Sequence, residues 1–289
     1  MRFIALAALL ALAACSTAPS QPQAVAMAGP GPTTIDQPGG RPSGYHLVWA
    51  DEFNAGVMPD TANWSYDTYR NKEGWYAGEK EYYSAGRAEN ARLENGSLII
   101  EARHERLSDL ADYGGQDYSS ARLVSKKTFT YGFVEARALL PCGKGVWPAI
   151  WTLPVAPYNV WPRDGEIDIL EYVGWNADKI YQTVQTGDYY YVVHKEKQVI
   201  TSIQGACGAW HRFQMTWTPD VVRLGIDDHD YVSFKNDGSG NYAEWPFTHP
   251  QNMILNVAVG GDFGGQQGID EAALPWRMQI DYVRLFQKA

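Results

Sequence analysis

The sequence has few cysteines, few basic residues and no second long apolar run. Three cysteines occur in 289 residues, so only one intramolecular disulfide can form. Lys and Arg number 24 against 33 Asp and Glu, and the net charge of -9 argues against a nucleic-acid partner, which would need a basic face. No run of 18 or more apolar residues follows the N-terminal segment, which argues against a transmembrane span. The six histidines are scattered without metal-ligand spacing.

Aromatic residues are abundant instead. The chain has 11 Trp, 18 Tyr and 9 Phe, which is 13% of its residues, within a hydrophobic content of 45%. That composition supports a sizeable core. Two explanations for the aromatic excess stay open at this point: flat rings that stack on sugars, or a large β-sheet core.

The N-terminus has the features of an export signal. Residues 1–14 carry Arg2 and then an apolar stretch that is too short to remain a membrane helix. The end of this stretch, Leu12-Ala13-Ala14-Cys15, resembles the lipobox of bacterial lipoproteins, which implies lipidation of Cys15. The alternative is an ordinary signal peptide with a chance cysteine. Ser16 after the cysteine favours the outer membrane, so we expect an exported lipoprotein that contacts the membrane through its lipid anchor only.

Residues 15–44 are rich in Pro, Gly, Ser and Gln and lack large apolar side chains, which predicts a flexible tether. We expect one folded domain over residues 45–289. Cys142 and Cys207 both lie in glycine-containing turns of that domain, which favours a disulfide over two free buried thiols.

The folded region reads as strands throughout. Period-two segments recur, for example at 97–104, 133–140, 253–259 and 278–286, and turn-forming clusters separate them. No helical periodicity exceeds two turns. The pattern predicts an all-β fold, either a two-sheet antiparallel β-sandwich or a barrel, and we favour a jelly-roll sandwich.

The segment 164–174 carries the strongest chemical signal. Glu166 and Asp168 share one face of the predicted strand, and a β-bulge would bring Glu171 to the same face. Acids on one otherwise apolar strand repel one another, which raises some of their pKa values. Three explanations remain: paired carboxylates for glycoside hydrolysis, an oxygen-ligand metal site, or a structural cluster. The aromatic residues nearby favour carbohydrate chemistry; they are Trp147, Trp151, Trp161, Tyr172 and Trp175.

The motif Gly165-Glu-Ile-Asp-Ile-Leu-Glu171 resembles the active-site signature of glycoside hydrolase family 16, in the longer form typical of laminarinases. Further blocks follow the family's order: 120–122, 131–137, 145–151, 254–261 and 280–284. The resemblance covers about 46–287. It implies a β-jelly roll with an open cleft and an endo-acting, retaining hydrolase of β-1,3-glucan (laminarin) or mixed β-1,3/1,4-glucan. Such an enzyme needs no cofactor for catalysis, and we expect a monomer.

The resemblance also implies roles for single residues. Glu166 would be the nucleophile, Glu171 the acid and base, and Asp168 a hydrogen-bond partner of the nucleophile. The residues expected to bind substrate are Asn90, Arg122, Trp147, Trp151, Trp161, Gln185 and Asn256, with Glu81 as a further candidate. Gln185 stands where a histidine is frequent in the family, and Phe263 stands where a tryptophan is usual.

A structural calcium ion is implied on the convex side, with Glu52, the Gly96 carbonyl and Asp281 as ligands. Three alternative functions remain open: a family-16 hydrolase of another polysaccharide such as a galactan, a transglycosylase, and a glucan-binding protein without turnover. Intact Glu166 and Glu171 speak against the last.

Overall fold

The computed structural model describes residues 41–289. The predicted signal peptide 1–14, the lipidation site Cys15 and most of the predicted tether 15–44 lie outside the described residues. None of the described helices is long and apolar enough to cross a membrane.

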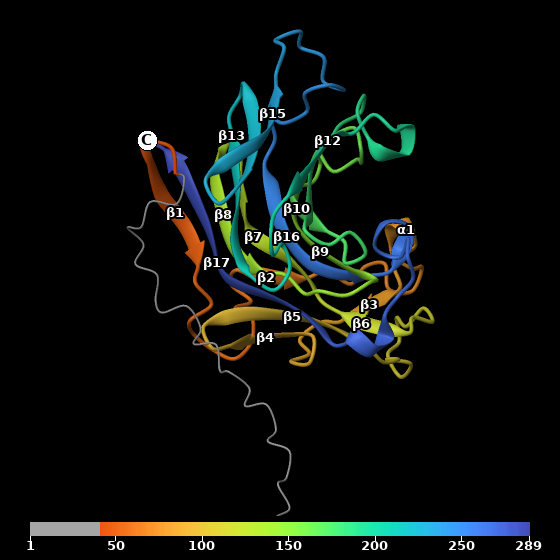
Figure 1. The fold of residues 1–289 in the computed structure, drawn as a ribbon. Coiled ribbons are helices and arrows are strands. Elements are labelled where there is room, and N and C mark those ends of the chain that lie inside the picture. The colour runs from red at the N-terminus through yellow and green to blue at the C-terminus, as the bar shows by residue number, and fades with distance from the viewer. Residues whose placement is uncertain (1–40) are drawn as a thin grey trace, which may run out of the picture. The chain divides into compact units, whose positions relative to one another are not determined.

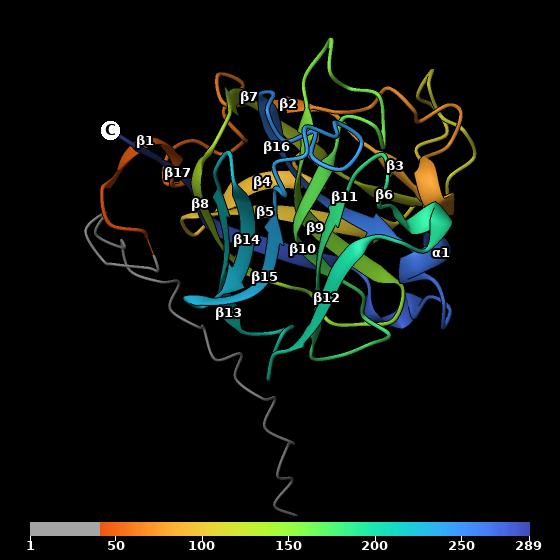
Figure 2. The same cartoon turned by 90° about the horizontal axis from the view of Figure 1, so that it is seen from above.

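The described residues form two sheets (Figures 1 and 2). The ten-stranded sheet has the order β15-β14-β13-β8-β17-β5-β6-β3, with β1 beside β17 and β4 beside β5. Its strands are β1 (Tyr45–Asp51), β3 (Glu81–Tyr83), β4 (Ala91–Glu94), β5 (Ser97–His104), β6 (Tyr118–Ser120), β8 (Gly132–Leu139), β13 (Trp210–Trp217), β14 (Val221–Ile226), β15 (His229–Lys235) and β17 (Trp276–Lys288).

The seven-stranded sheet has the order β12-β11-β10-β9-β16-β7-β2. Its strands are β2 (Trp64–Tyr66), β7 (Arg122–Phe129), β9 (Val146–Pro154), β10 (Glu166–Tyr172), β11 (Lys179–Gln185), β12 (Lys197–Ser202) and β16 (Gln251–Val259). The pairing is antiparallel except between β3 and β6. Helical segments are short: η1 (Tyr76–Gly78), η2 (Tyr191–Val193), α1 (Gly261–Gly264) and η3 (Glu271–Ala273).

Strand β9 shows how the sequence pattern produces this architecture. Every second residue, from Val146 to Pro154, is buried, whereas Trp147, Trp151 and Leu153 on the other face are partly exposed. Because successive strand side chains point to opposite faces, one face of β9 packs into the core and the other stays accessible. The accessible face therefore presents tryptophans beside β10, its neighbour in the sheet.

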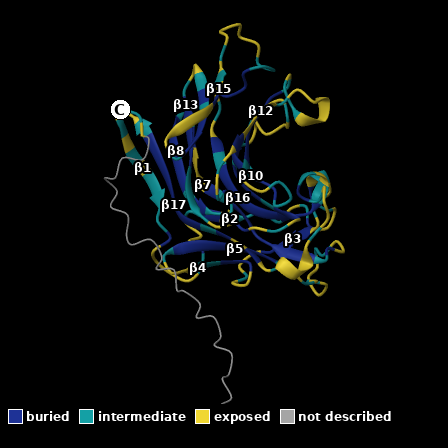
Figure 3. Ribbon diagram, in the orientation of Figure 1, coloured by how far each residue is buried: buried dark blue, intermediate teal, exposed yellow. Residues whose placement is uncertain are grey.

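The core contains many large apolar side chains. Its largest buried members include Trp64, Trp217 and Trp276. Figure 3 shows buried residues running along the strands and exposed residues in the connections. The predicted two-sheet antiparallel β-sandwich is confirmed, and part of the aromatic excess is core.

Cys142 and Cys207 are joined by a disulfide with a Cα–Cα distance of 5.3 Å. Cys142 lies between β8 and β9, and Cys207 lies between β12 and β13. Since β8 and β13 belong to one sheet and β9 and β12 to the other, the bridge joins two connections that run between the sheets.

Candidate active site

Strand β10 carries the three acidic residues. Its pairing with β11 shifts register between Asp168 and Glu171, and its pairing with β9 shifts between Asp168 and Leu170. The predicted β-bulge is therefore confirmed. It lets Ile169 and Leu170 both be fully buried while Glu171 stays partly exposed, as Glu166 does.

Glycines flank β10 for steric reasons. Gly165 has φ +92°, and a Cβ there would lie 2.8 Å from atoms of Pro246 and Phe247. After the strand, a Cβ on Gly174 would lie 1.6 Å from the Gly143 carbonyl oxygen. Larger residues do not fit at these positions, so the ends of β10 are fixed against neighbouring loops.

The acidic side chains have different hydrogen-bond partners. Gln185 Nε2 donates to Glu166 Oε1 at 2.7 Å and to Asp168 Oδ2 at 3.4 Å. Trp147 Nε1 donates to Glu171 Oε1 at 3.1 Å. The glutamine that stands where the family frequently has a histidine therefore contacts the expected nucleophile directly.

Burial raises the pKa of all three carboxyl groups, to different extents. Asp168 is 2% exposed, and burial together with the charges of Glu166 and Glu171 holds its pKa well above the usual value. Burial and the charge of Glu166 raise the pKa of Glu171 to about 8. At neutral pH Glu171 therefore holds a proton.

Glu166 differs because hydrogen bonds act against burial. Burial raises its pKa, whereas hydrogen bonds from Asp168, Trp161 and Gln185 lower it, as does the charge of Arg122. The hydrogen bond between Asp168 and Glu166 thus favours the ionised form of Glu166. The strand thus holds Glu166, whose ionised form is favoured by hydrogen bonds, and a protonated acid at Glu171, which is the division that a retaining glycosidase needs.

The aromatic side chains expected to bind substrate surround these groups. Trp161, 39% exposed, packs against Tyr190 and Tyr191 with ring centroids 5.7 and 5.6 Å away, and it lines a pocket with Leu153 and Gly165. Trp147 packs edge-on against Phe263 at 5.4 Å. The aromatic ring at 263 therefore lies beside the tryptophan that contacts Glu171.

Trp151 is held by a hydrogen-bond chain. Its Nε1 donates to Asn256 Oδ1 at 2.8 Å, and Asn256 Nδ2 donates to the Tyr83 hydroxyl at 3.0 Å. Tyr83 in turn donates to Glu79 Oε2 at 3.2 Å. The Arg122 guanidinium lies 4.7 Å from the Trp151 ring centroid. Asn256 thus uses both ends of its amide to position the tryptophan.

None of the hydrogen-bond partners of Asn90 lies on β10. It is fully buried, donates to the Glu101 carbonyl and the Ser119 hydroxyl, and accepts hydrogen bonds from Ser84 and Arg87. Its amide is satisfied by protein groups in this arrangement, and its role in sugar binding stays a prediction.

Glu79 and Tyr83 are site residues that the sequence analysis missed. Glu79, Glu81 and Tyr83 alternate along the chain, so period-two spacing could have placed them on one face. Glu81 is fully buried, and its Oε2 accepts from the Val259 amide at 2.6 Å. Burial and the charge of Glu79 hold the pKa of Glu81 well above its usual value.

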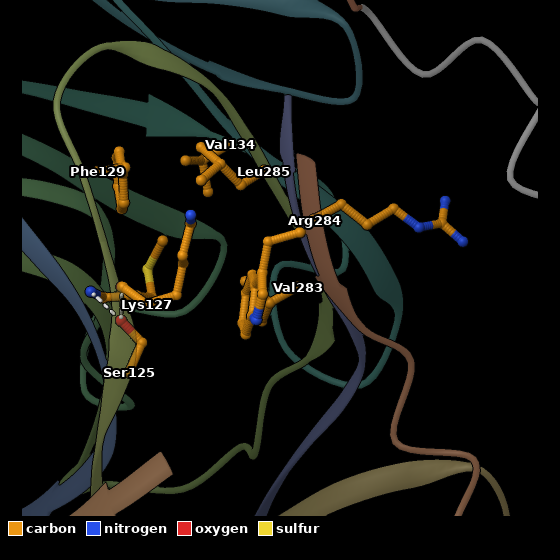
Figure 4. Close-up of a pocket in the computed structure, with 9 residues that line it drawn as sticks. Ser125, Lys127, Phe129, Val134, Val283, Arg284 and Leu285 are labelled. Atoms are coloured by element: carbon orange, nitrogen blue, oxygen red, sulfur yellow. Dashed lines mark hydrogen bonds between the residues drawn. The ribbon is translucent and has the colours of Figure 1, made fainter. Parts of the chain in front are cut away.

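A separate small pocket lies between the sheets, away from β10 (Figure 4). None of its lining residues is acidic. They are Trp49, Ser125, Lys127, Phe129, Val134, Met253, Val283, Arg284 and Leu285. The Ser125 hydroxyl donates to the Lys127 carbonyl at 2.8 Å. The pocket offers no acid and no activated nucleophile, so we assign the chemistry to β10.

Comparisons with known proteins agree with this geometry. The model of Glycosyl hydrolases family 16 matches residues 78–284, a span that contains β10 and its neighbours in the sheet. A beta-glucanase from Rhodothermus marinus is 42% identical over 252 residues, which are 84% of this chain and 85% of that protein.

Solved structures of the family are also similar. A mutant of SCLam, a non-specific endo-β-1,3(4)-glucanase from family GH16 with an oligosaccharide at its active site, has a TM-score of 0.84 and 51% identity, covering 87% of this chain and 98% of that one. The laminarinase from Rhodothermus marinus has a TM-score of 0.79 and 42% identity, covering 85% and 98%. The resemblance drawn from the acidic motif is thereby confirmed, and the chain belongs to glycosyl hydrolase family 16.

Proposed function

We propose that the chain is a retaining endo-β-1,3(4)-glucanase that cleaves laminarin or mixed-linkage glucan. The observation that carries the proposal is the contrast on β10: hydrogen bonds from Asp168 and Gln185 favour the ionised form of Glu166 against burial, whereas burial and the charge of Glu166 raise the pKa of Glu171 to about 8. The similarity to β-glucanases and laminarinases supports the substrate class.

The chemistry proceeds in two displacements. Glu166 attacks the anomeric carbon while Glu171 gives its proton to the departing glycosidic oxygen, which leaves a glycosyl ester on Glu166. Glu171, now ionised, takes a proton from water, and that water attacks the same carbon and releases Glu166. Asp168 and Gln185 hold Glu166 by hydrogen bonds throughout.

The test is sugar release by the full-length protein from laminarin, mixed-linkage glucan, agarose and carrageenan. We expect the wild type to release a series of oligosaccharides from the two glucans. In Glu171→Gln the rate of cleavage should fall on the order of a thousandfold, because the proton donor is missing. Cleavage of a galactan alone would move the protein to another specificity of the family. Binding of glucan without cleavage would favour a binding protein.

The nucleophile is tested separately with Glu166→Ala and added azide. We expect hydrolysis to be lost and an α-glycosyl azide to form, because azide enters from the face that the carboxylate occupied. Normal turnover of Glu166→Ala would contradict the assignment.

Both carboxylates of the predicted calcium site are already paired with arginines. Both oxygens of Glu52 accept from Arg284, at 2.7 and 2.8 Å, and Asp281 pairs with Arg137 at 2.8 Å. Among residues 41–289 no group of three or more His, Cys, Asp or Glu side chains is arranged to hold a metal. The arginines already balance both carboxylates, so calcium at Glu52, Gly96 and Asp281 stays a prediction from the resemblance.

We also propose that the enzyme is exported and anchored through Cys15, as a monomer. The support is the apolar segment before Cys15 and the composition of residues 15–44.

A further inference from the structure

Two tyrosines outside the carboxylate site are unusually exposed. Tyr69 and Tyr76 are 62% and 55% exposed, more than the other large aromatic side chains among residues 41–289. Their hydroxyl groups lie 3.1 Å apart and are hydrogen-bonded to each other. Single exposed apolar residues are normal on protein surfaces, but a paired, oriented set needs an explanation.

The segment that carries them, residues 67–78, is fixed from inside. Asn71 is fully buried; its Oδ1 accepts from Trp75 Nε1 at 2.9 Å and from the Tyr83 amide at 3.0 Å, and its Nδ2 donates to the Tyr83 carbonyl at 2.9 Å. The segment is therefore attached to β3 through Tyr83. The hydroxyl group of the same tyrosine belongs to the series of hydrogen bonds that holds Trp151.

The exposed rings are also held individually. Arg70 donates to the Gly74 carbonyl at 3.0 Å, and its guanidinium lies 4.2 Å from the Tyr76 ring centroid. Tyr69 packs edge-on against Trp75 at 5.4 Å. A ring that is already oriented loses little conformational entropy when a ligand binds.

Packed side chains connect the pair to the strand that carries the carboxylates. The Arg122 guanidinium lies 5.0 Å from the Trp75 ring centroid and 4.7 Å from that of Trp151. Trp151 pairs with Asp168 across β9 and β10. An unbroken set of packed groups thus leads from the carboxylates to the surface tyrosines.

We propose that Tyr69 and Tyr76 form a distal glucan-binding subsite, which takes glucose units of a chain whose other units occupy the cleft. The occupant is a neutral polysaccharide, because pyranose rings present C–H faces that pack on aromatic rings and hydroxyls that the tyrosines can bond. This inference rests on the proposed glucanase function and deepens it: the enzyme prefers long chains.

The test compares a long and a short substrate. In the full-length enzyme carrying Tyr69→Ala and Tyr76→Ala, we expect KM for laminarin to rise about five- to twentyfold with kcat nearly unchanged, since tenfold corresponds to about 1.4 kcal/mol. For laminaritriose, which is too short to span both sites, we expect kcat/KM to stay within about twofold of the wild type.

Two controls separate binding from structural damage. Tyr69→Phe with Tyr76→Phe keeps both rings and should retain most of the laminarin affinity. Tyr231→Ala removes a 40% exposed tyrosine on β15 and should leave the kinetic constants for both substrates unchanged. An equal loss on laminarin and laminaritriose, or unchanged KM for laminarin, would overturn the subsite.

Binding without turnover distinguishes this inference from the proposed function. In Glu171→Gln protein, electrophoresis through a laminarin-containing gel measures retention directly. If the wild type fails to cleave glucans but retention still depends on Tyr69 and Tyr76, the subsite holds and the glucanase proposal fails. Retention that is absent, or indifferent to these tyrosines, refutes the subsite.

Discussion

Glu166, Asp168 and Glu171 belong to one strand, yet burial, like charges and hydrogen bonds act on them differently. Burial and the charge of Glu166 raise the pKa of Glu171, and the Trp147 hydrogen bond acts against them, whereas hydrogen bonds from Asp168 and Gln185 favour the ionised form of Glu166. Each contact has a sign, so substitutions should move the alkaline limb of the pH–activity profile in a defined direction.

Trp147→Phe should move that limb upward. The Trp147 hydrogen bond favours the ionised form of Glu171 and lowers its pKa, while burial and Glu166 raise it to about 8. Without the indole donor the pKa rises further, so the acid stays protonated to higher pH. The measurement is kcat/KM on laminarin across the neutral and alkaline pH range; a limb that stays fixed or moves down would contradict this prediction.

Glu79→Gln should move the limb the opposite way. The charge of Glu79 raises the pKa of Glu171, because like charges disfavour a further negative charge. Removing that charge lowers the pKa, so activity should fall off at a lower pH than in the wild type. The same pH series checks it, and Glu73→Gln is the matched control, because Glu73 is an exposed acid that is not among the charges acting on Glu171.

The conformation of the connection 155–165 between β9 and β10 is held by hydrogen bonds to one buried acid, Asp164. Asp164 accepts from the Val160 amide at 2.8 Å and from the Tyr242 hydroxyl at 2.9 Å. The hydrogen bond from Arg163 is the main cause that lowers the pKa of Asp164 to about 2. This connection carries Trp161, so its order determines one wall of the pocket that Trp161 lines with Leu153 and Gly165.

Asp164→Asn should destabilise the protein by about 1–3 kcal/mol at neutral pH, the range for removing charged buried hydrogen bonds. Because the folded pKa of about 2 lies below the unfolded value near 3.9, the stabilisation is present above about pH 4 and is lost as the pH falls through the folded pKa. Denaturant unfolding of both proteins checks it: the difference in the free energy of unfolding should shrink on acidification. A difference that grew as the pH fell would rule out this explanation.

The fold and the catalytic strand were predictable from local pattern. Period-two segments identified the sandwich, and three acids among buried apolar residues on β10 required the bulge. The series of hydrogen bonds from Trp151 through Asn256 and Tyr83 to Glu79 was not predictable from local pattern, because it joins residues up to 173 positions apart. The burial of Asn90 was not predictable for the same reason: its partners come from separate strands and turns.

On the scale of the whole molecule, the Cys142–Cys207 bridge constrains how the sheets separate. It closes a span of 65 residues, for which the loss of unfolded-chain entropy corresponds to about 4 kcal/mol. The double variant Cys142→Ser with Cys207→Ser should therefore unfold at a clearly lower temperature. Calorimetry of the oxidised wild type and the double variant measures this; equal melting temperatures would show that the bridge adds no stability.

Glu166 and Glu171, the two carboxyl groups that we propose to react, both lie on β10, so their separation is set by one short stretch of polypeptide. Changes in the outer strands, or in a connection that does not adjoin β10, leave that spacing unchanged. Evolution can therefore rebuild the rim for a new polysaccharide while the bond-breaking step is inherited intact. Swapping residues 67–78 between relatives should therefore transfer the preference for chain length without removing the ability to cleave.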